Sequence, residues 1–267
     1  MNAVGPTMSI LDKIIASTRQ TIARDIAEVS RDDLRSQLTD LPPTRGFAGA
    51  LAATDEVRLI AEVKRQSPSA GLIREDFDPA AIAAAYQSGG AACISVLTDE
   101  PFFGGHLSFL SDVRAAVDLP LLRKDFIVDE YQIDQARLAG ADAVLLIAEC
   151  LSPSDLRRLH DHAASLSMDT LIELYEPENL PAVLATGTRL VGVNNRDLRT
   201  FQTNLDHTLE IGRNVPEDRI LVGESGIHTA ADIAHLKTGG VKAVLVGESL
   251  MRQPDIQRAT QKLLQPA

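Results

Sequence analysis

The stretch Gly89-Gly90-Ala91-Ala92-Cys93-Ile94-Ser95-Val96 recurs along this chain. Similar runs begin at Ala139 and Gly239, and a weaker copy begins at Thr186. In each copy, a glycine of the kind that ends a helix is followed by a short apolar run of the kind that forms a buried strand. The copies lie roughly 50 residues apart, which indicates a repeated unit of strand and helix.

A second kind of apolar run falls between these copies and ends in ionisable residues. Such runs occupy residues 58–64, 119–125, 170–173 and 220–224. The two kinds together give eight strands that alternate with helices, a pattern typical of a parallel sheet. Eight such units predict an α/β fold in which residues 51–267 form a single (β/α)8 TIM barrel.

Residues 1–50 are expected to form an N-terminal helical extension. Their apolar residues recur at the spacing of an amphipathic helix: Ile10, Ile14, Ile15, Ile22, Ile26 and Val29. The pattern then ends at Leu41-Pro42-Pro43. Periodicity shows an apolar face but not what that face covers. The extension could therefore cover the barrel mouth or lie under its floor, and the two are equally favoured.

Composition excludes several classes of function. The chain has 267 residues, 45% of them hydrophobic, which is enough for one large domain. Its formal net charge of -11 argues against nucleic acid or an anionic membrane surface as the main partner. The absence of a long apolar segment or a signal-peptide pattern predicts a cytoplasmic protein. Cys93 and Cys150 lie in or beside apolar runs, and we expect them to be small buried hydrophobes.

The ionisable strand ends point to acid–base chemistry. Five residues belong to this set: Glu62, Lys64, Lys124, Glu173 and Glu224. Glu62 and Lys64 are two apart, so they project to the same side of their strand. If that side is the interior, two lysines and up to three carboxylates share the barrel mouth, where active sites of this fold lie. We expect burial to push their pKa values toward neutrality, so that the set can donate and accept protons. The alternative is a set of structural ion pairs closing the barrel top.

The loops after the seventh and eighth strands predict a phosphate site. They contain Ser225-Gly226 and Gly247-Glu248, and in this fold such loops commonly bind phosphate through backbone N–H groups. Ser67 in the first loop could reach the same phosphate. Tight turns would explain either loop alone, but both at the expected places favour a phosphate site.

Two further segments could contact a substrate. Asn194 and Arg196 follow the sixth strand, where an amide and a guanidinium suit hydroxyls or a carboxylate; Asn195 and Asp197 are expected to hold the loop. The pair Phe102-Phe103 follows the second strand and offers aromatic surface for a planar group, although core packing of one ring is the simpler interpretation.

His160 and His162 resemble a pair of metal ligands. They fall on a predicted helix distant from the mouth, so we expect a solvated helix face there and no metal site.

Taken in order, these motifs resemble the indole-3-glycerol phosphate synthase family. The resemblance is carried by Ile60-Ala61-Glu62-Val63-Lys64, Leu122-Arg123-Lys124-Asp125-Phe126, Leu171-Ile172-Glu173, Val193-Asn194-Asn195-Arg196-Asp197, Glu224-Ser225-Gly226-Ile227 and Leu245-Val246-Gly247-Glu248-Ser249. It implies a carboxy-lyase of tryptophan biosynthesis that converts 1-(2-carboxyphenylamino)-1-deoxyribulose 5-phosphate into indole-3-glycerol phosphate, carbon dioxide and water. It implies a small-molecule substrate and no metal or organic cofactor. We also expect a monomer, with weak homo-oligomerisation left open.

The resemblance also implies roles for individual residues. Lys124 would be the general acid for ring closure, and Glu173 a candidate base for dehydration. Lys64 would hold the substrate carboxylate or donate the second proton, and Glu62 would orient the lysines and hydroxyl groups. The remaining implied contacts are Asn194 and Glu224 to the sugar, Phe103 to the anthranilate ring, and Ser67, Ser225, Gly226, Gly247 and the Glu248 backbone to the phosphate.

The chain departs from the family pattern at two positions. Where the family usually has Gly-Ser, this chain has Gly105-His106, so a serine contact is not expected there. Some relatives have serine at the position of Glu248. A glutamate side chain cannot favour a phosphate, so only its backbone N–H can contribute.

Three alternatives remain open. Another phosphate-binding barrel, such as phosphoribosylanthranilate isomerase, needs a carboxylate with a thiol or similar group, and neither cysteine lies at a charged strand end. A Schiff-base aldolase would use Lys124 or Lys64 as its nucleophile. A catalytically silent barrel would bind a phosphometabolite or a partner protein, although the intact set of charged residues argues against it.

Overall fold

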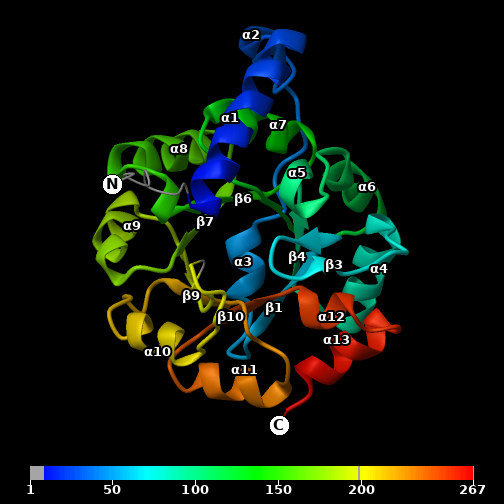
Figure 1. Cartoon of the computed structure of the whole chain (residues 1–267), viewed down its shortest axis with the longest axis vertical. Helices are drawn as coiled ribbons and strands as arrows, with labels where there is room; N and C mark the ends of the chain where they lie inside the picture. The colour runs from blue at the N-terminus through cyan, green and yellow to red at the C-terminus, as the bar shows by residue number, and fades with distance from the viewer. Residues whose placement is uncertain (1–8, 198, 267) are drawn as a thin grey trace, which may run out of the picture.

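The computed structural model describes residues 9–197 and 199–266. Eight parallel strands form a closed barrel: β1 (Arg58–Val63), β4 (Cys93–Leu97), β5 (Leu121–Lys124), β6 (Ala143–Ile147), β7 (Asp169–Leu174), β8 (Leu190–Asn194), β9 (Ile220–Glu224) and β10 (Ala243–Val246). The ring closes where β1 pairs with β10, with Arg58 opposite Ala243 (Figure 1). The predicted (β/α)8 barrel is confirmed.

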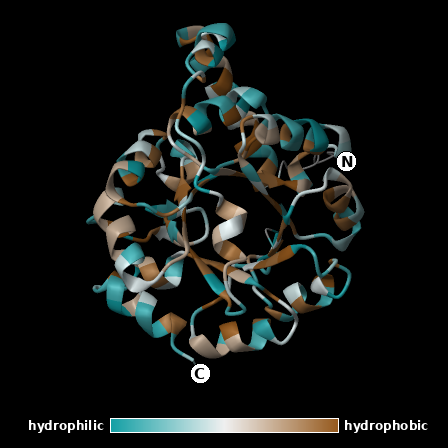
Figure 2. Cartoon of the chain, turned by 180° about the vertical axis from the view of Figure 1, so that it is seen from behind, coloured by the Kyte–Doolittle hydropathy of each residue, from teal (hydrophilic) through white to brown (hydrophobic). Residues whose placement is uncertain are grey.

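Helices surround the barrel and follow its strands. The outer layer consists of α4 (Pro79–Gly89), α6 (Ser108–Ala116), α7 (Glu130–Leu138), α8 (Pro153–Ser165), α9 (Leu180–Thr186), α10 (Asp206–Gly212), α11 (Ala230–Lys237) and α13 (Ile256–Leu264). Asp78 and Ser152 cap α4 and α8 ahead of a proline, as the sequence indicates. Apolar residues gather on the strands, while much of the outer helix surface is hydrophilic (Figure 2).

Short elements complete the connections between strands and helices. They are the hairpin strands β2 (Gln66–Ser67) and β3 (Gly71–Leu72), the helices α5 (Glu100–Phe103) and α12 (Glu248–Met251), and the 3-10 turns η1 (Ala148–Cys150) and η2 (Pro177–Asn179). Cys93 is fully buried as expected, while Cys150, at the end of η1, is only partly buried. Within the described parts of the chain, no helix combines the length and the apolar character needed to span a bilayer.

The barrel floor is closed by a short helix from the extension, α3 (Phe47–Leu51). Phe47, Ala48 and Leu51 are buried and join the apolar cluster that fills the barrel interior. The Ala48 N–H donates to Asp169 Oδ2 at 2.8 Å, at the start of β7. Both views place α3 in the middle of the ring (Figures 1 and 2). The division between residues 50 and 51 would fall inside this helix, and it stays a prediction.

The barrel mouth is covered by the first helix, α1 (Ile10–Glu28). Ile10, Leu11 and Ile14 line the cavity at the carboxyl ends of the strands. Of the predicted apolar stripe, Ile14 and Ile22 are buried, whereas Val29 is 38% exposed. The extension therefore occupies both expected places, with α1 at the mouth and α3 at the floor.

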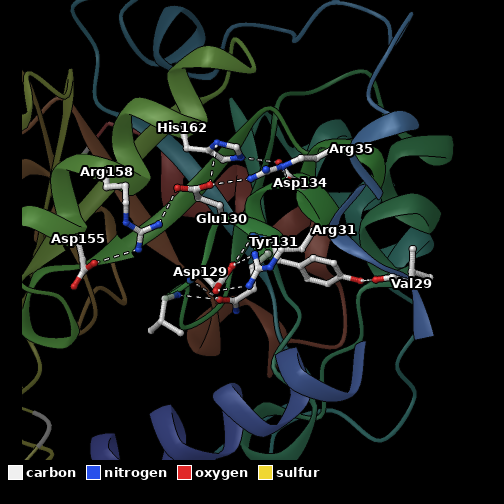
Figure 3. Close-up of polar contacts among 12 residues, drawn as sticks. Val29, Arg31, Arg35, Asp129, Glu130, Tyr131, Asp134, Asp155, Arg158 and His162 are labelled. Carbon is white, nitrogen blue, oxygen red and sulfur yellow. Dashed lines mark hydrogen bonds and ion pairs between the residues drawn. The ribbon is translucent and has the colours of Figure 1, made fainter. Parts of the chain in front are cut away.

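An ion-pair network, here called the arm clamp, holds α2 (Arg31–Ser36) to the outside of the barrel (Figure 3). Its members are Arg31, Arg35, Asp129, Glu130, Asp134, Arg158 and His162. Arg31 binds both oxygens of Asp129, at 2.6 and 2.9 Å, and Arg35 reaches Glu130 at 2.9 Å. The Tyr131 hydroxyl approaches the carbonyl oxygen of Val29 at 2.9 Å, which ties the end of α1 to α7.

The expectation of a solvated face at His160 and His162 is wrong. His162 Nε2 lies 2.6 Å from Asp134 Oδ1, and 17% of the histidine side chain is exposed. His160 Nδ1 lies 2.7 Å from Thr170 Oγ1, and burial lowers the pKa of His160. This face of α8 packs against α7 and β7, so its histidines hold elements together.

Candidate active site

A cavity lies at the carboxyl ends of the barrel strands, beneath α1. All five ionisable strand-end residues line it: Glu62, Lys64, Lys124, Glu173 and Glu224, here called the mouth cluster. They come from β1, β5, β7 and β9 and the residue directly after β1. The structure thus brings together the residues that the sequence predicts to meet.

The mouth cluster contains two groups of ion-paired residues, one around Lys124 and one around Lys64. Lys124 Nζ lies 3.2 Å from Glu173 Oε2 and 3.7 Å from Glu224 Oε2. Lys64 Nζ lies 2.5 Å from Glu62 Oε2. The Asn194 amide donates to the other oxygen of Glu173 at 3.1 Å. Each lysine therefore has its own carboxylate partner, and Glu173 is held from two sides.

Lys124 stays protonated at neutral pH. Burial opposes its charge, but the carboxylates of Glu173, Glu224 and Glu62 outweigh burial and raise the pKa of Lys124. For Glu62, burial works against ionisation, and Lys64 and Lys124 reverse this and lower its pKa. The expectation that burial moves the whole set toward neutrality is wrong for Lys124 and for Glu62. The pKa of each moves away from neutrality, because the opposite charges beside it outweigh burial.

Glu224 behaves in the opposite way. Burial and the neighbouring Glu173 carboxylate raise the pKa of Glu224 well above its usual range. Glu224 is 2% exposed, and its Oε1 has no hydrogen-bond partner among the described residues. A buried carboxylate in this position favours its protonated form. Glu224 is thus the carboxyl group of the mouth cluster whose ionisation the surroundings oppose, because Glu173 lies beside it in a buried site.

Two glycines make room for these carboxylates. A Cβ at Gly192 in β8 would clash with Glu224 Oε1, and a Cβ at Gly247 would clash with Glu62 Oε2. Gly247 was predicted only as a place where a phosphate approaches the backbone. Gly192 was missed, although a glycine inside an apolar strand often marks a close approach.

Part of the cavity is lined by the predicted phosphate loops. Ser67, Ser225, Gly226, Gly247 and Glu248 all line it. Ser225 and Gly226 have left-handed backbones, with φ of 66° and 77°. Such a conformation in a non-glycine residue costs on the order of 1 kcal/mol and is common at binding sites.

The last phosphate-loop residue, Glu248, begins α12, and its side chain is bound by Arg252 at 2.9 and 3.0 Å. The Glu248 carboxylate is therefore paired with a cation. This pairing reduces its repulsion of a phosphate, to which only the backbone N–H of Glu248 is expected to bind. Ser249 Oγ donates to the carbonyl oxygen of Ile227 at 3.0 Å, which joins the two phosphate loops.

The cavity also has apolar lining. The Phe103 and Phe126 rings line it with centroids 6.0 Å apart, and Ile10, Leu11 and Ile14 of α1 line it as well. Neither Phe102 nor Phe103 is buried in the core, so the core-packing interpretation is wrong. Two lining aromatics, Phe126 and Phe201, were not singled out from the sequence.

The loop after β8 contributes Arg196 and Phe201 to the cavity lining, and other residues of it hold the loop in place. Arg196 lines the cavity, and its N–H donates to Asn194 Oδ1 at 3.0 Å. Asn195 is 1% exposed and binds Thr208 and the Ser225 carbonyl oxygen, which confirms its structural role.

His106 is exposed and lies 2.8 Å from Ser108 Oγ; it is not among the described residues that line the active-site cavity. Among residues 9–197 and 199–266, no three or more His, Cys, Asp or Glu side chains form a group that could hold a metal ion.

Comparisons with known proteins agree with this geometry. A family model described as indole-3-glycerol phosphate synthase matches residues 11–263. A curated protein of that name from Rhodopirellula baltica is 68% identical over 257 residues, covering 96% of this chain and 99% of the relative. Another of that name, from Albidiferax ferrireducens, is 47% identical over 249 residues, covering 92% and 94%.

Solved structures support the fold at greater distance. Thiamine phosphate pyrophosphorylase from Pyrococcus furiosus superposes with a TM-score of 0.60 at 17% identity, covering 78% of this chain and 94% of that one. This likeness shows a shared barrel fold. By the family match and the two curated relatives, the chain belongs to the indole-3-glycerol phosphate synthase family.

Proposed function

We propose that this chain closes, decarboxylates and dehydrates 1-(2-carboxyphenylamino)-1-deoxyribulose 5-phosphate to indole-3-glycerol phosphate, using the mouth cluster for acid–base catalysis. Membership of the family makes the chain a carboxy-lyase of tryptophan biosynthesis. The observation that carries the residue assignment is the position of Lys124 in the cavity lining, with its Nζ 3.2 Å from Glu173 and 3.7 Å from Glu224.

The lining of the cavity can orient the substrate. The anthranilate ring would pack against Phe103 and Phe126. The phosphate would bind at Ser67 and the loops containing Ser225 and Gly247. Binding both groups would hold the reacting carbons beside the mouth cluster, and this placement turns binding energy into orientation.

Ring closure needs an acid. The aromatic carbon that bears the carboxylate attacks the ribulose carbonyl carbon, and the carbonyl oxygen takes a proton from the Lys124 ammonium. The carbon–carboxylate bond then breaks, carbon dioxide leaves, and its electron pair restores the aromatic ring. Lys64, with Arg196, is placed to hold the carboxylate until that step, and Glu62 orients Lys64.

Dehydration needs both an acid and a base. Glu173 removes a proton from the carbon next to nitrogen, while the hydroxyl group leaves as water after receiving a proton. The Asn194 amide fixes the orientation of Glu173 for this step. Lys64, which gives up no proton in ring closure, is the acid that donates the proton to the leaving hydroxyl.

The remaining features of the proposal concern the setting of the reaction. The partner is a small-molecule substrate, and the proposed enzyme acts as a cytoplasmic monomer without a metal or organic cofactor. In its proposed organisation, residues 1–50 are an extension that covers a barrel of residues 51–267.

Two rival enzymes are disfavoured by the chemistry of the cavity. A Schiff-base aldolase needs a neutral lysine as nucleophile, whereas the pKa of Lys124 is raised. An isomerase that uses a thiol would need a cysteine at the site. Neither Cys93 nor Cys150 is among the described lining residues, and burial raises the pKa of both thiols.

The test is indole fluorescence after mixing the protein with the carboxyphenylamino-deoxyribulose phosphate. Lys124→Ala should lower kcat by about 10²- to 10⁴-fold, the usual contribution of a general acid. Lys237→Ala is the matched control, since Lys237 pairs with Glu56 on the outer surface. A folded wild-type protein that binds the substrate without forming indole would be a silent barrel.

A further inference from the structure

Helix α5 separates two cavities. Phe103, its last residue, lines the active-site cavity, whereas Asp99, Glu100 and Pro101 line a second cavity of about 550 Å³. The second cavity lies between α1, α6, α7 and the start of α5, and the proposed reaction does not use it. We propose that Asp99, facing this second cavity, is a positioning residue that sets the place of the Phe103 ring and thereby the binding of the aromatic part of the substrate. This inference rests on the proposed function.

Three hydrogen bonds join Asp99 to the segment that carries Phe103. Asp99 Oδ1 accepts from the N–H groups of Phe102 at 2.8 Å and Phe103 at 3.1 Å. The Asp99 carbonyl oxygen accepts from the Gly105 N–H at 2.8 Å. A four-residue helix cannot hold itself in water. Its geometry therefore depends on the residue that caps it.

The C-terminal end of α5 is closely packed. Gly104 has a left-handed backbone with φ of 59°, and a Cβ there would come within 3.1 Å of the Gln66 side chain. A Cβ on Gly105 would come within 2.5 Å of the Leu97 carbonyl oxygen. Because the C-terminal end of α5 is closely packed, loss of the cap would release its N-terminal end. Phe103 is the residue of α5 whose displacement would reach the substrate.

The Asp99 carboxylate is tuned by its surroundings. Burial raises the pKa of Asp99 to about 6, although the N–H groups of Phe102 and Phe103 act against this rise. The titratable and charged groups around it are Glu100 and His106 in its own segment, Arg123 and Asp125 at the end of β5, and Arg24, Asp25 and Glu28 on α1. Of these, Asp125 and Glu100 also raise the pKa of Asp99.

The second cavity gives protons a route to this carboxylate. Ionised carboxylates accept stronger hydrogen bonds than neutral ones, so the cap on α5 weakens as the pH falls through about 6. Positioning by Asp99 should therefore show in the pH dependence of KM.

The experiment compares Asp99→Ala with Asp99→Asn. Asp99→Ala should raise KM by about 2- to 30-fold, the range expected from loss of an N-cap, with kcat within about 3-fold of wild type. Asp99→Asn should restore KM, because an amide oxygen accepts the same two bonds. In the wild type KM should rise below pH 6, and in Asp99→Asn that rise should be absent.

The control is Asp255→Ala, which removes a similar N-cap from α13. Asp255 is not among the described residues that line either cavity. Its loss should lower thermal stability and leave KM unchanged. An Asp99→Ala variant that loses stability with wild-type KM, or an Asp99→Asn variant that keeps the wild-type pH dependence of KM, would overturn the positioning role.

Calorimetric binding of indole-3-glycerol phosphate separates this inference from the proposed function. A wild-type protein that binds this product but does not turn over the substrate would contradict the proposed function and leave the positioning role intact. Unchanged product affinity in Asp99→Ala would end the positioning role alone.

Discussion

The mouth cluster and the arm clamp contain similar residues in contrasting settings. In the mouth cluster, three carboxylates face two lysines inside the barrel, and one oxygen of Glu224 has no partner among the described residues. In the arm clamp, each carboxylate has at least one cation or histidine partner, and its arginines are 39–46% exposed. In the arm clamp the arginines are thus partly exposed to water although Asp134 is buried, whereas all members of the mouth cluster are largely buried and one oxygen of Glu224 lacks a partner.

The energetics of the two regions differ accordingly. An exposed ion pair contributes about 0–1 kcal/mol to stability, because water and salt screen it. Buried charges lose their hydration, and their mutual attraction only partly offsets that loss. Changes at the mouth should therefore affect activity strongly and stability in either direction. Changes in the clamp should affect stability weakly and chemistry hardly at all.

The largest effect is expected from Gly192→Ala. The new Cβ would clash with Glu224 Oε1 and displace that carboxylate from Lys124. A displacement of about 1 Å can lower kcat about 10²-fold, and overpacking costs about 1–3 kcal/mol. Steady-state kinetics and urea unfolding measure both effects.

The matched control is Gly49→Ala, because no atom lies within 4 Å of the Cβ position at Gly49. It should leave kcat unchanged. Wild-type kcat in Gly192→Ala would show that Glu224 does not depend on the space beside β8.

An intermediate effect is expected from Glu224→Gln on the pH dependence of stability. The raised pKa of Glu224 means that the folded protein retains a proton which the unfolded chain releases above about pH 4.3. The contribution of Glu224 to stability is full below that pH and is lost as the pH rises through the folded pKa.

Glu224→Gln should thus be about 1 kcal/mol more stable than the wild type near neutral pH, with the difference shrinking on acidification below about pH 4.3. Urea unfolding between pH 4 and 8 measures this. A difference that grows on acidification would mean that Glu224 is ionised in the folded state.

The smallest effect is expected in the arm clamp, from Arg31→Met. Loss of the bidentate pair with Asp129 should lower stability by at most about 1 kcal/mol, and 1 M salt should reduce the difference. Arg24→Met, which removes a more exposed pair with Asp25, is the control and should have less effect still. A large fall in kcat for Arg31→Met would mean that the clamp shapes the mouth directly.

Much of the fold and of the mouth cluster was predictable, because both follow from local patterns. A glycine stop marks four of the strands and an ionisable end marks the other four, and the strand ends of a closed barrel must converge. The surface that the extension covers was not predictable, since an apolar stripe on a helix does not show which part of the chain packs against it. The helix α3 spans five residues, too few for any helical period to show.

The remaining incorrect or missing predictions concern contacts between residues that lie on different helices and strands. The direction of the Lys124 pKa shift is decided by three carboxylates on three strands, set against burial. The need for Gly192 appears only when Glu224 is placed opposite it. The histidines of α8 were misassigned because their partners lie on α7 and β7.

The position of the arm clamp along the chain has a consequence for biosynthesis. Arg31 precedes its partner Asp129 by 98 residues. At about 5–20 residues per second, the ribosome therefore synthesises Asp129 about 5–20 s after Arg31. During that interval the apolar face of α1 has no surface of its own chain to cover. The catalytic mouth gains its cover and its last loop only once β10 has closed the ring against β1, so no nascent fragment presents a complete active site.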